Sequence, residues 1–254
     1  MRERYGLLGE KLGHSYSPRI HQEMGGYAYD LIELKPEELP GFLAAGEFRG
    51  LNVTIPYKQT VIPFLDRLSD RARTVGAVNT IVREADGTLT GYNTDWDGFE
   101  GLIRRTGLEI RDRKCLVLGS GGASKMAVCC LREMGAREVR VISRTGEDNY
   151  GNLGRHADAE ILVNATPVGM YPHAGVSPVQ LDGFPRLEGV LDLIYNPART
   201  ELLRLAEARS IPCANGLYML VEQARIACEL FLGREIPAER SAEVTAAMEA
   251  ERKE

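Results

Sequence analysis

The chain has 254 residues, 44% of them hydrophobic and 26% charged, which is enough for one large hydrophobic core or two smaller ones. Its formal net charge is -5 and its Lys and Arg residues are scattered, so we expect no nucleic-acid partner. No apolar run approaches the roughly 18–20 residues of a membrane helix, and the N-terminus lacks the apolar segment of a signal peptide, so we expect a cytoplasmic protein without a membrane partner.

In the first part of the chain, short apolar runs alternate with stretches of helical spacing. The strand-like runs are 5–9, 29–34, 50–55, 77–82 and 88–93, and the helix-like stretches are 17–24, 36–46 and 57–65. Such alternation indicates an open α/β sheet. We therefore predict that residues 1–95 form an α/β domain.

A helix-like stretch at 96–107 leads into a second series of strands and helices. An apolar strand, a Gly-rich turn and a helix follow one another at 114–136, and further apolar runs are 138–144, 160–166 and 189–195. This succession is typical of a Rossmann-type sheet. We predict a second α/β domain at 96–216 and expect a ligand to bind between the two domains.

Two stretches near the C-terminus, 216–233 and 237–251, carry Leu, Val, Ala and Met at helical spacing. No strand pattern separates them. We therefore predict that residues 217–254 form helices that pack back on the first domain.

The cysteines point to neither a disulfide framework nor a metal site. Their number is odd and no two have C-x-x-C spacing. We interpret all five as small core residues and predict no bound metal. They are Cys115, Cys129, Cys130, Cys213 and Cys228.

A glycine-rich segment stands between the strand at 114–118 and the following helix. Gly119, Gly121 and Gly122 would let the backbone turn tightly and approach a pyrophosphate, held by free N–H groups and the helix dipole. Ser124 stands where this pattern usually has its last small residue. The alternative is a turn that only permits close packing of strand and helix.

The next strand ends in Ser143, Arg144 and Thr145. An NAD site usually has Asp or Glu at this place, whereas Arg suits the 2′-phosphate of NADP. The alternative for Arg144 is a solvated arginine at a strand end.

Three polar clusters in the first domain fall at strand ends, where ligands of α/β sheets gather: 52–58, 76–80 and 91–98. Lys58 offers a proton-transfer group, Asn79 an amide that can bind hydroxyls, and Asp95 a carboxylate that can orient both.

These features together resemble the shikimate dehydrogenase family, and the resemblance covers nearly the whole chain. It rests on nine segments in the family's order: HSYSPRIH (14–21), NVTIPYK (52–58), GAVNT (76–80), GYNTDWDG (91–98), GSGGAS (119–124), SRT (143–145), NATPVGM (164–170), DLIYNP (192–197) and NGLYMLVEQA (215–224). The resemblance implies an oxidoreductase that reduces 3-dehydroshikimate to shikimate with NADPH in chorismate and aromatic amino-acid biosynthesis.

The resemblance also implies a role for each matching residue. Lys58 and Asp95 would be the catalytic pair, with Lys58 giving a proton to the substrate oxygen. The implied substrate residues are Ser15 and Ser17 for the carboxylate, with Asn52, Thr54, Asn79, Tyr195 and Gln223 around the ring. The implied cofactor residues are Gly119, Gly121, Gly122, Ala123, Ser143, Arg144, Thr145, Thr166, Met170, Gly216 and Met219. The chain could act as a monomer or as a homodimer.

Several of these residues have a structural alternative. Ser17 followed by Pro18 is an ordinary helix N-cap with Pro at the first helical position. His14 and His21 lack a nucleophile or metal-ligand spacing, so we interpret them as packing or hydrogen-bonding groups. Trp96 and Met219 could equally be core residues.

The chain departs from the family between Arg144 and Asn164, where a full helix and a strand are missing from the pattern. Glu147 and Asp148 replace a second basic residue that usually follows the Arg-Thr pair, which weakens the preference for NADP. Lys11 and Gln22 also differ from the usual Pro and Asn.

Three other functions share part of this sequence pattern. A quinate/shikimate dehydrogenase using NAD as well as NADP is compatible with Glu147 and Asp148. A non-catalytic sensor of shikimate-like ligands or nucleotides would not need both Lys58 and Asp95. A folate-type dehydrogenase is disfavoured because the segments at 14–18 and 52–58 match the shikimate pattern.

Overall fold

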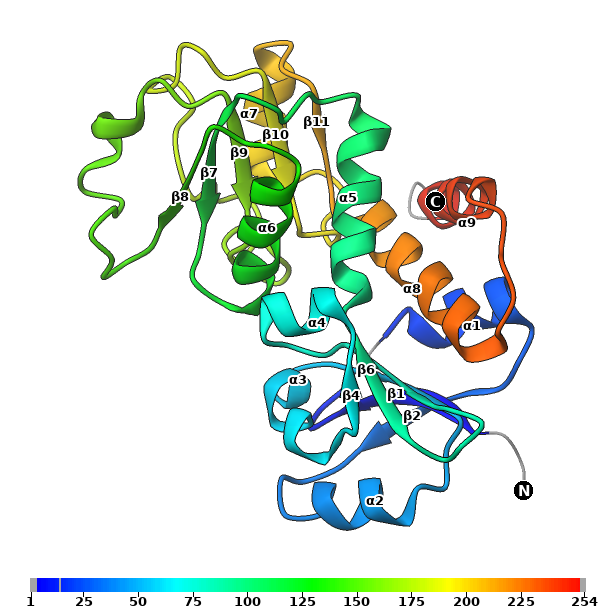
Figure 1. Cartoon of the computed structure of the whole chain (residues 1–254). Helices are drawn as coiled ribbons and strands as arrows, with labels where there is room; N and C mark the ends of the chain where they lie inside the picture. The colour runs from blue at the N-terminus through cyan, green and yellow to red at the C-terminus, as the bar shows by residue number, and fades with distance from the viewer. Residues whose placement is uncertain (1–3, 14, 252–254) are drawn as a thin grey trace. The chain divides into compact units, whose positions relative to one another are not determined.

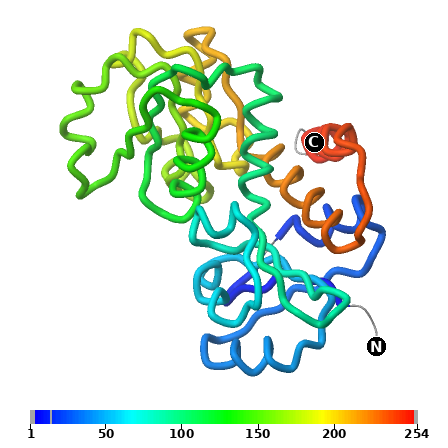
Figure 2. Tube along the Cα trace, viewed as in Figure 1, coloured from blue at the N-terminus to red at the C-terminus, as the bar shows by residue number. Residues whose placement is uncertain are grey.

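The structure is a computed structural model that describes residues 4–13 and 15–251. The chain forms two compact units, the first made of residues up to Asp97 and from Val221 onward, and the second of Gly98–Leu220. The chain passes between them inside two helices, α5 (Thr94–Thr106) and α8 (Leu217–Leu232), as Figures 1 and 2 show. Because each boundary between the units falls inside a helix, the helical sequence pattern continues across it and does not reveal where one unit ends.

The first unit contains a six-stranded sheet in the order β2-β1-β3-β5-β6-β4. Its strands are β1 (Tyr5–Gly9), β2 (Tyr29–Glu33), β3 (Gly50–Val53), β4 (Arg67–Leu68), β5 (Thr80–Arg83) and β6 (Leu89–Tyr92). The central strand β1 runs parallel to β2 and β3, whereas β5 is antiparallel to both β3 and β6. The sheet is therefore mixed, because a short turn joins β5 to β6 and a short turn permits only antiparallel pairing.

Short helices connect the strands of this sheet and bury its core. They are α1 (Ser17–Gly25), α2 (Leu39–Ala45), α3 (Tyr57–Thr60), the 3-10 helix η1 (Ile62–Phe64) and α4 (Asp70–Val75). Leu8, Leu51 and Ile81 from three neighbouring strands are fully buried in one cluster with Leu39 and Tyr57. The predicted open α/β sheet is confirmed here.

The second unit is a five-stranded parallel sheet in the order β11-β10-β9-β7-β8. Its elements are β7 (Lys114–Leu118), α6 (Gly122–Glu133), β8 (Glu138–Ile142), η2 (Leu153–His156), β9 (Ile161–Asn164), β10 (Gly189–Asp192), α7 (Glu201–Ala208) and β11 (Cys213–Ala214). All residues of β7, β9 and β10 are buried, as expected for a parallel sheet whose two faces are covered. The predicted Rossmann-type fold is confirmed.

Residues 143–160, all of which the structure describes, contain η2 but no α-helix and no strand. The connection from β8 to β9 is therefore a compact loop. This is the stretch where the sequence pattern lacks an αβ unit.

The C-terminal part of α8 and helix α9 (Glu239–Glu251) belong to the first unit, as predicted. A side chain on Gly50 of β3 would meet the ring of Phe231 in α8, since its Cβ would lie 2.3 Å from Phe231 Cδ1. Arg19 of α1 binds Glu251 of α9 with Nη2 to Oε1 at 2.6 Å. Residues more than 200 positions apart in the sequence thus close the first unit.

Within the described ranges 4–13 and 15–251, no helix combines the length and apolarity needed to cross a bilayer. The cysteines are all free thiols; Cys115, Cys130 and Cys228 are buried, and the other two are half-buried.

Candidate active site and dinucleotide site

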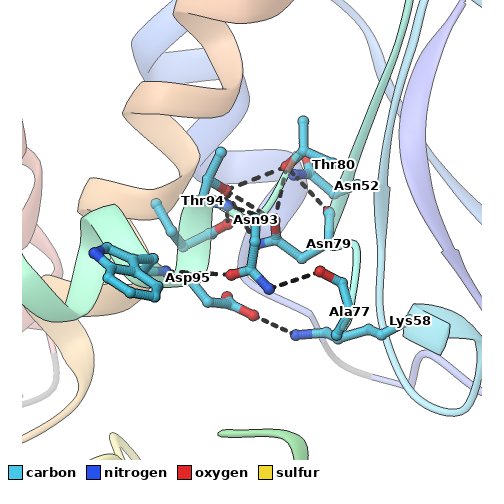
Figure 3. A network of polar contacts seen from close by, with 10 residues as sticks. Asn52, Lys58, Ala77, Asn79, Thr80, Asn93, Thr94 and Asp95 are labelled. Carbon is cyan, nitrogen blue, oxygen red and sulfur yellow. Dashed lines mark hydrogen bonds and ion pairs between the residues drawn. The ribbon is translucent and has the colours of Figure 1, made fainter. Parts of the chain in front are cut away.

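The structure brings Lys58 and Asp95 together in the first unit. Lys58 lies on α3, just beyond β3, and Asp95 lies in the first turn of α5. Lys58 Nζ donates to Asp95 Oδ2 at 2.6 Å, and the two side chains remain 30% and 22% exposed (Figure 3). An ammonium group that is charge-paired yet accessible can exchange protons with a bound ligand and with water.

A buried amide and hydroxyl network lies beside this ion pair (Figure 3). Asn79 Oδ1 accepts from the Thr94 backbone N–H at 2.7 Å, and Asn79 Nδ2 donates to Thr94 Oγ1 at 3.0 Å. Asn52 Nδ2 donates to Thr80 Oγ1 at 3.0 Å. Thr94 Oγ1 also donates to Gln223 Oε1 of α8, at 3.4 Å. Three predicted substrate residues, Asn52, Asn79 and Gln223, are thereby joined.

The sequence interpretation missed Thr80, Asn93 and Thr94 as members of this network. Asn93 Nδ2 donates to the Ala77 carbonyl at 2.9 Å and its Oδ1 accepts from the Trp96 backbone N–H at 3.3 Å, so Asn93 fixes the start of α5. The signal was available, because all three lie inside the segments 76–80 and 91–98. Trp96 itself is 1% exposed, so it is a core residue, as one of the two sequence interpretations suggested.

Ser17 does not cap helix α1, so that alternative is wrong. Tyr16 is the N-cap and already has helical angles, with φ -77° and ψ -11°, and no side chain caps the helix. The helix therefore begins at Ser17, one residue earlier than the Ser-Pro pattern suggested. The Ser17 backbone N–H donates to Ser15 Oγ at 3.2 Å, which places the two predicted carboxylate ligands side by side. His14 lies outside the described residues.

Thr54 directly follows β3 and is half-buried, and its backbone N–H donates to the Leu8 carbonyl at 2.9 Å. The carboxyl ends of β1 and β3 thus hold Thr54 at the same sheet edge as the start of α3.

The glycine-rich segment of the second unit has the geometry of an anion site. Gly119 has φ +104°, and a Cβ there would lie 3.0 Å from the Ala165 carbonyl oxygen, so this position requires glycine. Gly121 is the N-cap of the 12-residue helix α6, and no side chain caps its first N–H groups. Gly121, Gly122 and Ala123 are exposed, so these N–H groups are open to a ligand.

Ser124 takes the place of the expected small residue and binds locally. Its Oγ donates to the Gly119 carbonyl at 2.6 Å, and the side chain is 1% exposed. The buried serine therefore stabilises the glycine turn and does not cover the exposed residues 121–123.

A pocket of about 680 Å³ opens beside this turn. It is lined by Gly119, Ser120, Gly121, Ser143, Arg144, Tyr150, Ala165, Thr166, Pro167, Val168, Ser177 and Pro178. Five predicted cofactor residues, from three separate segments, are thereby assembled around one space. Thr145, next to Arg144, is exposed.

A buried chain of hydrogen bonds holds Thr166 at one side of the pocket. Asn164 Oδ1 accepts from the Thr166 N–H at 3.0 Å and from Thr166 Oγ1 at 2.7 Å. Asn164 Nδ2 donates to Asp192 Oδ1 at 2.9 Å, and Asp192 Oδ2 accepts from Thr200 Oγ1 at 2.6 Å. Burial raises the pKa of Asp192, and the hydrogen bonds to Thr200, Ile194 and Asn164 act in the opposite direction. The sequence interpretation did not assign roles to Asn164 or Asp192.

The other predicted residues of the second unit lie further along the chain. Met170 is 45% exposed at the end of the turn after β9, and Tyr195 is half-buried after β10. Gly216 is needed for packing, since a Cβ there would lie 2.2 Å from the Leu193 carbonyl oxygen. Met219 on α8 is half-buried, so the suggestion that it is a core residue is not supported.

Comparison with known proteins identifies the family. The family model described as "Shikimate dehydrogenase substrate binding domain" matches residues 7–81. A shikimate dehydrogenase (NADP(+)) of Clostridium beijerinckii is 38% identical over 249 residues, which cover 90% of this chain and 92% of the relative. The chain belongs to the shikimate dehydrogenase family. The resemblance seen in the sequence is thereby confirmed.

Solved structures of shikimate dehydrogenases share the fold. A chorismate mutase/shikimate 5-dehydrogenase fusion protein from Clostridium acetobutylicum superposes with a TM-score of 0.92 at 35% identity, covering 99% of both chains. A shikimate 5-dehydrogenase from Thermus thermophilus, solved with NADP(H) and shikimate, superposes with a TM-score of 0.85 at 33% identity, covering 96% of this chain and 99% of that one.

Proposed function

We propose that this chain is a shikimate dehydrogenase that catalyses the reversible, NADPH-dependent reduction of 3-dehydroshikimate to shikimate. Family membership at 38% identity supports the activity. The observation that carries the site is the accessible pair of Lys58 Nζ and Asp95 Oδ2, 2.6 Å apart, next to a buried network of amides and hydroxyls. A proton-transfer pair has no use in a protein that only binds its ligand, so catalysis is favoured over the sensor function.

Lys58 is the proposed proton donor. When a hydride adds to the carbonyl carbon, the C=O π pair moves to oxygen, which takes a proton from the Lys58 ammonium group and leaves a neutral amine. Water can restore that proton because the lysine is 30% exposed. In the oxidation direction the neutral amine accepts the hydroxyl proton. Asp95 holds Nζ in place through a charge-assisted hydrogen bond.

The remaining substrate residues orient a polyhydroxylated ring. We assign the ligand carboxylate to the Ser15 and Ser17 hydroxyls. For the ring and its hydroxyls we assign Asn52, Thr54, Asn79, Tyr195 and Gln223. The network joining Asn52, Asn79 and Gln223 limits their side-chain motion, which lowers the entropy cost of binding.

The second unit fits NADP. A bound reduced nicotinamide would supply the hydride. Gly119, the exposed N-terminus of α6 and the 680 Å³ pocket suit a pyrophosphate and an adenosine, and Arg144 can bind a 2′-phosphate with two charge-assisted hydrogen bonds. The other residues that we assign to the cofactor are Gly121, Gly122, Ala123, Ser143, Thr145, Thr166, Met170, Gly216 and Met219.

We further propose that residues 1–95 serve substrate binding and catalysis, 96–216 bind the dinucleotide and 217–254 complete the first domain. All the assigned side chains come from one chain, so one chain is the proposed active unit, whether it is a monomer or part of a homodimer. The free thiols suit a reducing compartment, and we place the enzyme in the cytoplasm.

The direct test is to incubate the purified chain with shikimate and NADP and to follow the absorbance of the reduced nicotinamide. We expect turnover with shikimate and NADP. The rate should be lower when quinate replaces shikimate or when NAD replaces NADP. If calorimetry shows that shikimate binds but no nicotinamide is reduced, the protein is a sensor and the proposal is wrong.

A further inference from the structure

The loop that replaces an αβ unit after β8 is closed by its own hydrogen bonds. The Ser143 N–H donates to the Asp148 carbonyl at 3.2 Å. The Asn149 N–H donates to Asn152 Oδ1 at 2.8 Å, and Asn152 Nδ2 donates to the Glu147 carbonyl at 2.8 Å. These bonds lie on both sides of Tyr150, so the loop presents that side chain in one defined place.

Tyr150 contacts both the hydrophobic core and the pocket of the second unit. Its ring is half-buried and packs against the hydrophobic cluster of the second unit, as does Leu153. The same ring lines the pocket beside the glycine turn, together with Arg144 and Pro178. Burial raises the pKa of the Tyr150 hydroxyl, which the nearby Arg144 guanidinium opposes, so the ring is a neutral aromatic wall at neutral pH.

Asp148 of this loop contacts two basic side chains that are not among the residues lining the pocket. Asp148 Oδ1 lies 2.9 Å from His156 Nε2, and Asp148 Oδ2 lies 3.8 Å from Arg140 Nη1. The contact with His156 lowers the pKa of Asp148. The positive charge of Arg140 offsets part of the negative charge of Asp148, so Asp148 should repel a phosphate at Arg144 less than the sequence suggested.

We propose that Tyr150 is a base-binding residue of the dinucleotide site, whose ring stacks on the adenine while Arg144 in the same pocket binds the 2′-phosphate. This inference rests on the proposed use of NADP. A nucleotide base offers a flat π face, and an aromatic ring is the side chain that best matches it. The loop thus contributes an aromatic side chain to the pocket beside Arg144.

The test uses 2′,5′-ADP, which carries the adenine and the 2′-phosphate but lacks the nicotinamide. The main variant is Tyr150→Leu, which keeps an apolar side chain on the core but removes the aromatic face. Loss of a base–aromatic stack is expected to weaken 2′,5′-ADP binding by about tenfold in isothermal titration calorimetry. Tyr150→Phe should bind within about twofold of the parent, because the stacking face remains.

Leu153→Ala is the matched control, since Leu153 packs on the same cluster and is not among the residues that line the pocket. It should lower the melting temperature without weakening 2′,5′-ADP binding. If Tyr150→Leu binds as the parent does, or if Leu153→Ala weakens binding equally, Tyr150 has no specific role. If the parent itself does not bind 2′,5′-ADP, the proposed use of NADP fails first, so the two failures are distinguishable.

Discussion

At the scale of single residues, the proposed catalytic pair combines a short contact with partial exposure. Lys58 and Asp95 come from α3 and α5, and each is placed by the end of a strand. A pair of this kind contributes little to stability, because water competes for both charges. Its value lies in the reaction, where the ammonium group must be near the substrate oxygen.

Replacement of Lys58 by Ala should therefore lower kcat by about 10²–10⁴, because the proton donor acts chiefly in the transition state. Shikimate binding should change little. Steady-state kinetics together with calorimetry of shikimate binding would separate the two effects. Lys35→Ala, at an exposed lysine, is the control and should behave as the parent. A near-normal kcat for Lys58→Ala would remove this residue from the catalytic role.

Ser15→Ala and Ser17→Ala should each raise the KM for shikimate by roughly three- to tenfold, as expected for one lost hydrogen bond. Because Ser17 does not cap α1, its removal should leave the melting temperature almost unchanged. Kinetics and thermal unfolding of both variants test this. A Ser17 variant that melts early but binds shikimate normally would indicate a structural role instead.

Arg144→Ala should reduce the preference for NADP over NAD by roughly ten- to a hundredfold, since a charged hydrogen-bond donor to the 2′-phosphate is lost. The kcat/KM with NAD should barely change. The exposed Arg186→Ala in the same unit is a suitable control. The assignment of Arg144 is wrong if the parent prefers NAD or if the variant keeps its preference for NADP.

At the scale of elements, a buried cluster joins α1, β2 and α8 and contacts Asn52. His21 Nδ1 lies 2.7 Å from the Tyr27 hydroxyl, and the His21 ring stacks on Tyr29 at 4.0 Å between centroids. Tyr29 Oη donates to Asn52 Oδ1 at 2.7 Å. Cys228 of α8 contacts both His21 and Tyr27. The packing of three elements therefore fixes the amide of Asn52.

This cluster should make the first unit sensitive to acid. Burial lowers the pKa of His21 to about 3, outweighing the opposing effect of Asn52, whereas an unfolded histidine titrates near 6.5. Below about pH 6.5, His21 therefore binds a proton in the unfolded chain but not in the folded chain. The free energy of unfolding decreases as the pH falls from 6.5 towards the pKa of His21 in the folded chain.

Between pH 7 and pH 5, this effect should lower the free energy of unfolding by about 2 kcal/mol. Urea unfolding of the parent and of His21→Phe at both pH values would measure it. The variant is expected to be less stable at pH 7, because Tyr27 loses one of its two hydrogen-bond partners, but to show a smaller change between the two pH values. Equal pH dependence in both proteins would contradict a neutral buried His21.

At the scale of the whole molecule, the chain crosses between its two units twice, in α5 and in α8. Asp95 and Gln223 stand near these crossings, on the first-unit side. The C-terminal helices complete the first unit through Phe231 on Gly50 and Glu251 on Arg19. The contact between Gln223 and Thr94 therefore belongs to a unit that the last part of the chain completes.

Much of this protein could be predicted from sequence because the signals are local. Three features depend only on neighbouring residues, so the sequence alone predicts them. They are the alternation of strands and helices, the glycine turn at 119–122 and the polar segments at strand ends. The missing helix and strand after Arg144 were visible in the same way. Family segments in their expected order then specified the chemistry of Lys58 and Asp95.

Other features were decided only by the tertiary structure, because they join residues that are distant in the chain. Thr94 and Gln223 are 129 positions apart, and their contact depends on α8 packing against the first unit. The start of α1 at Ser17 depends on backbone angles that the Ser-Pro pattern leaves open. Tyr150 shares a pocket with the glycine turn only in the folded loop, since long-range packing determines which side chains line one pocket.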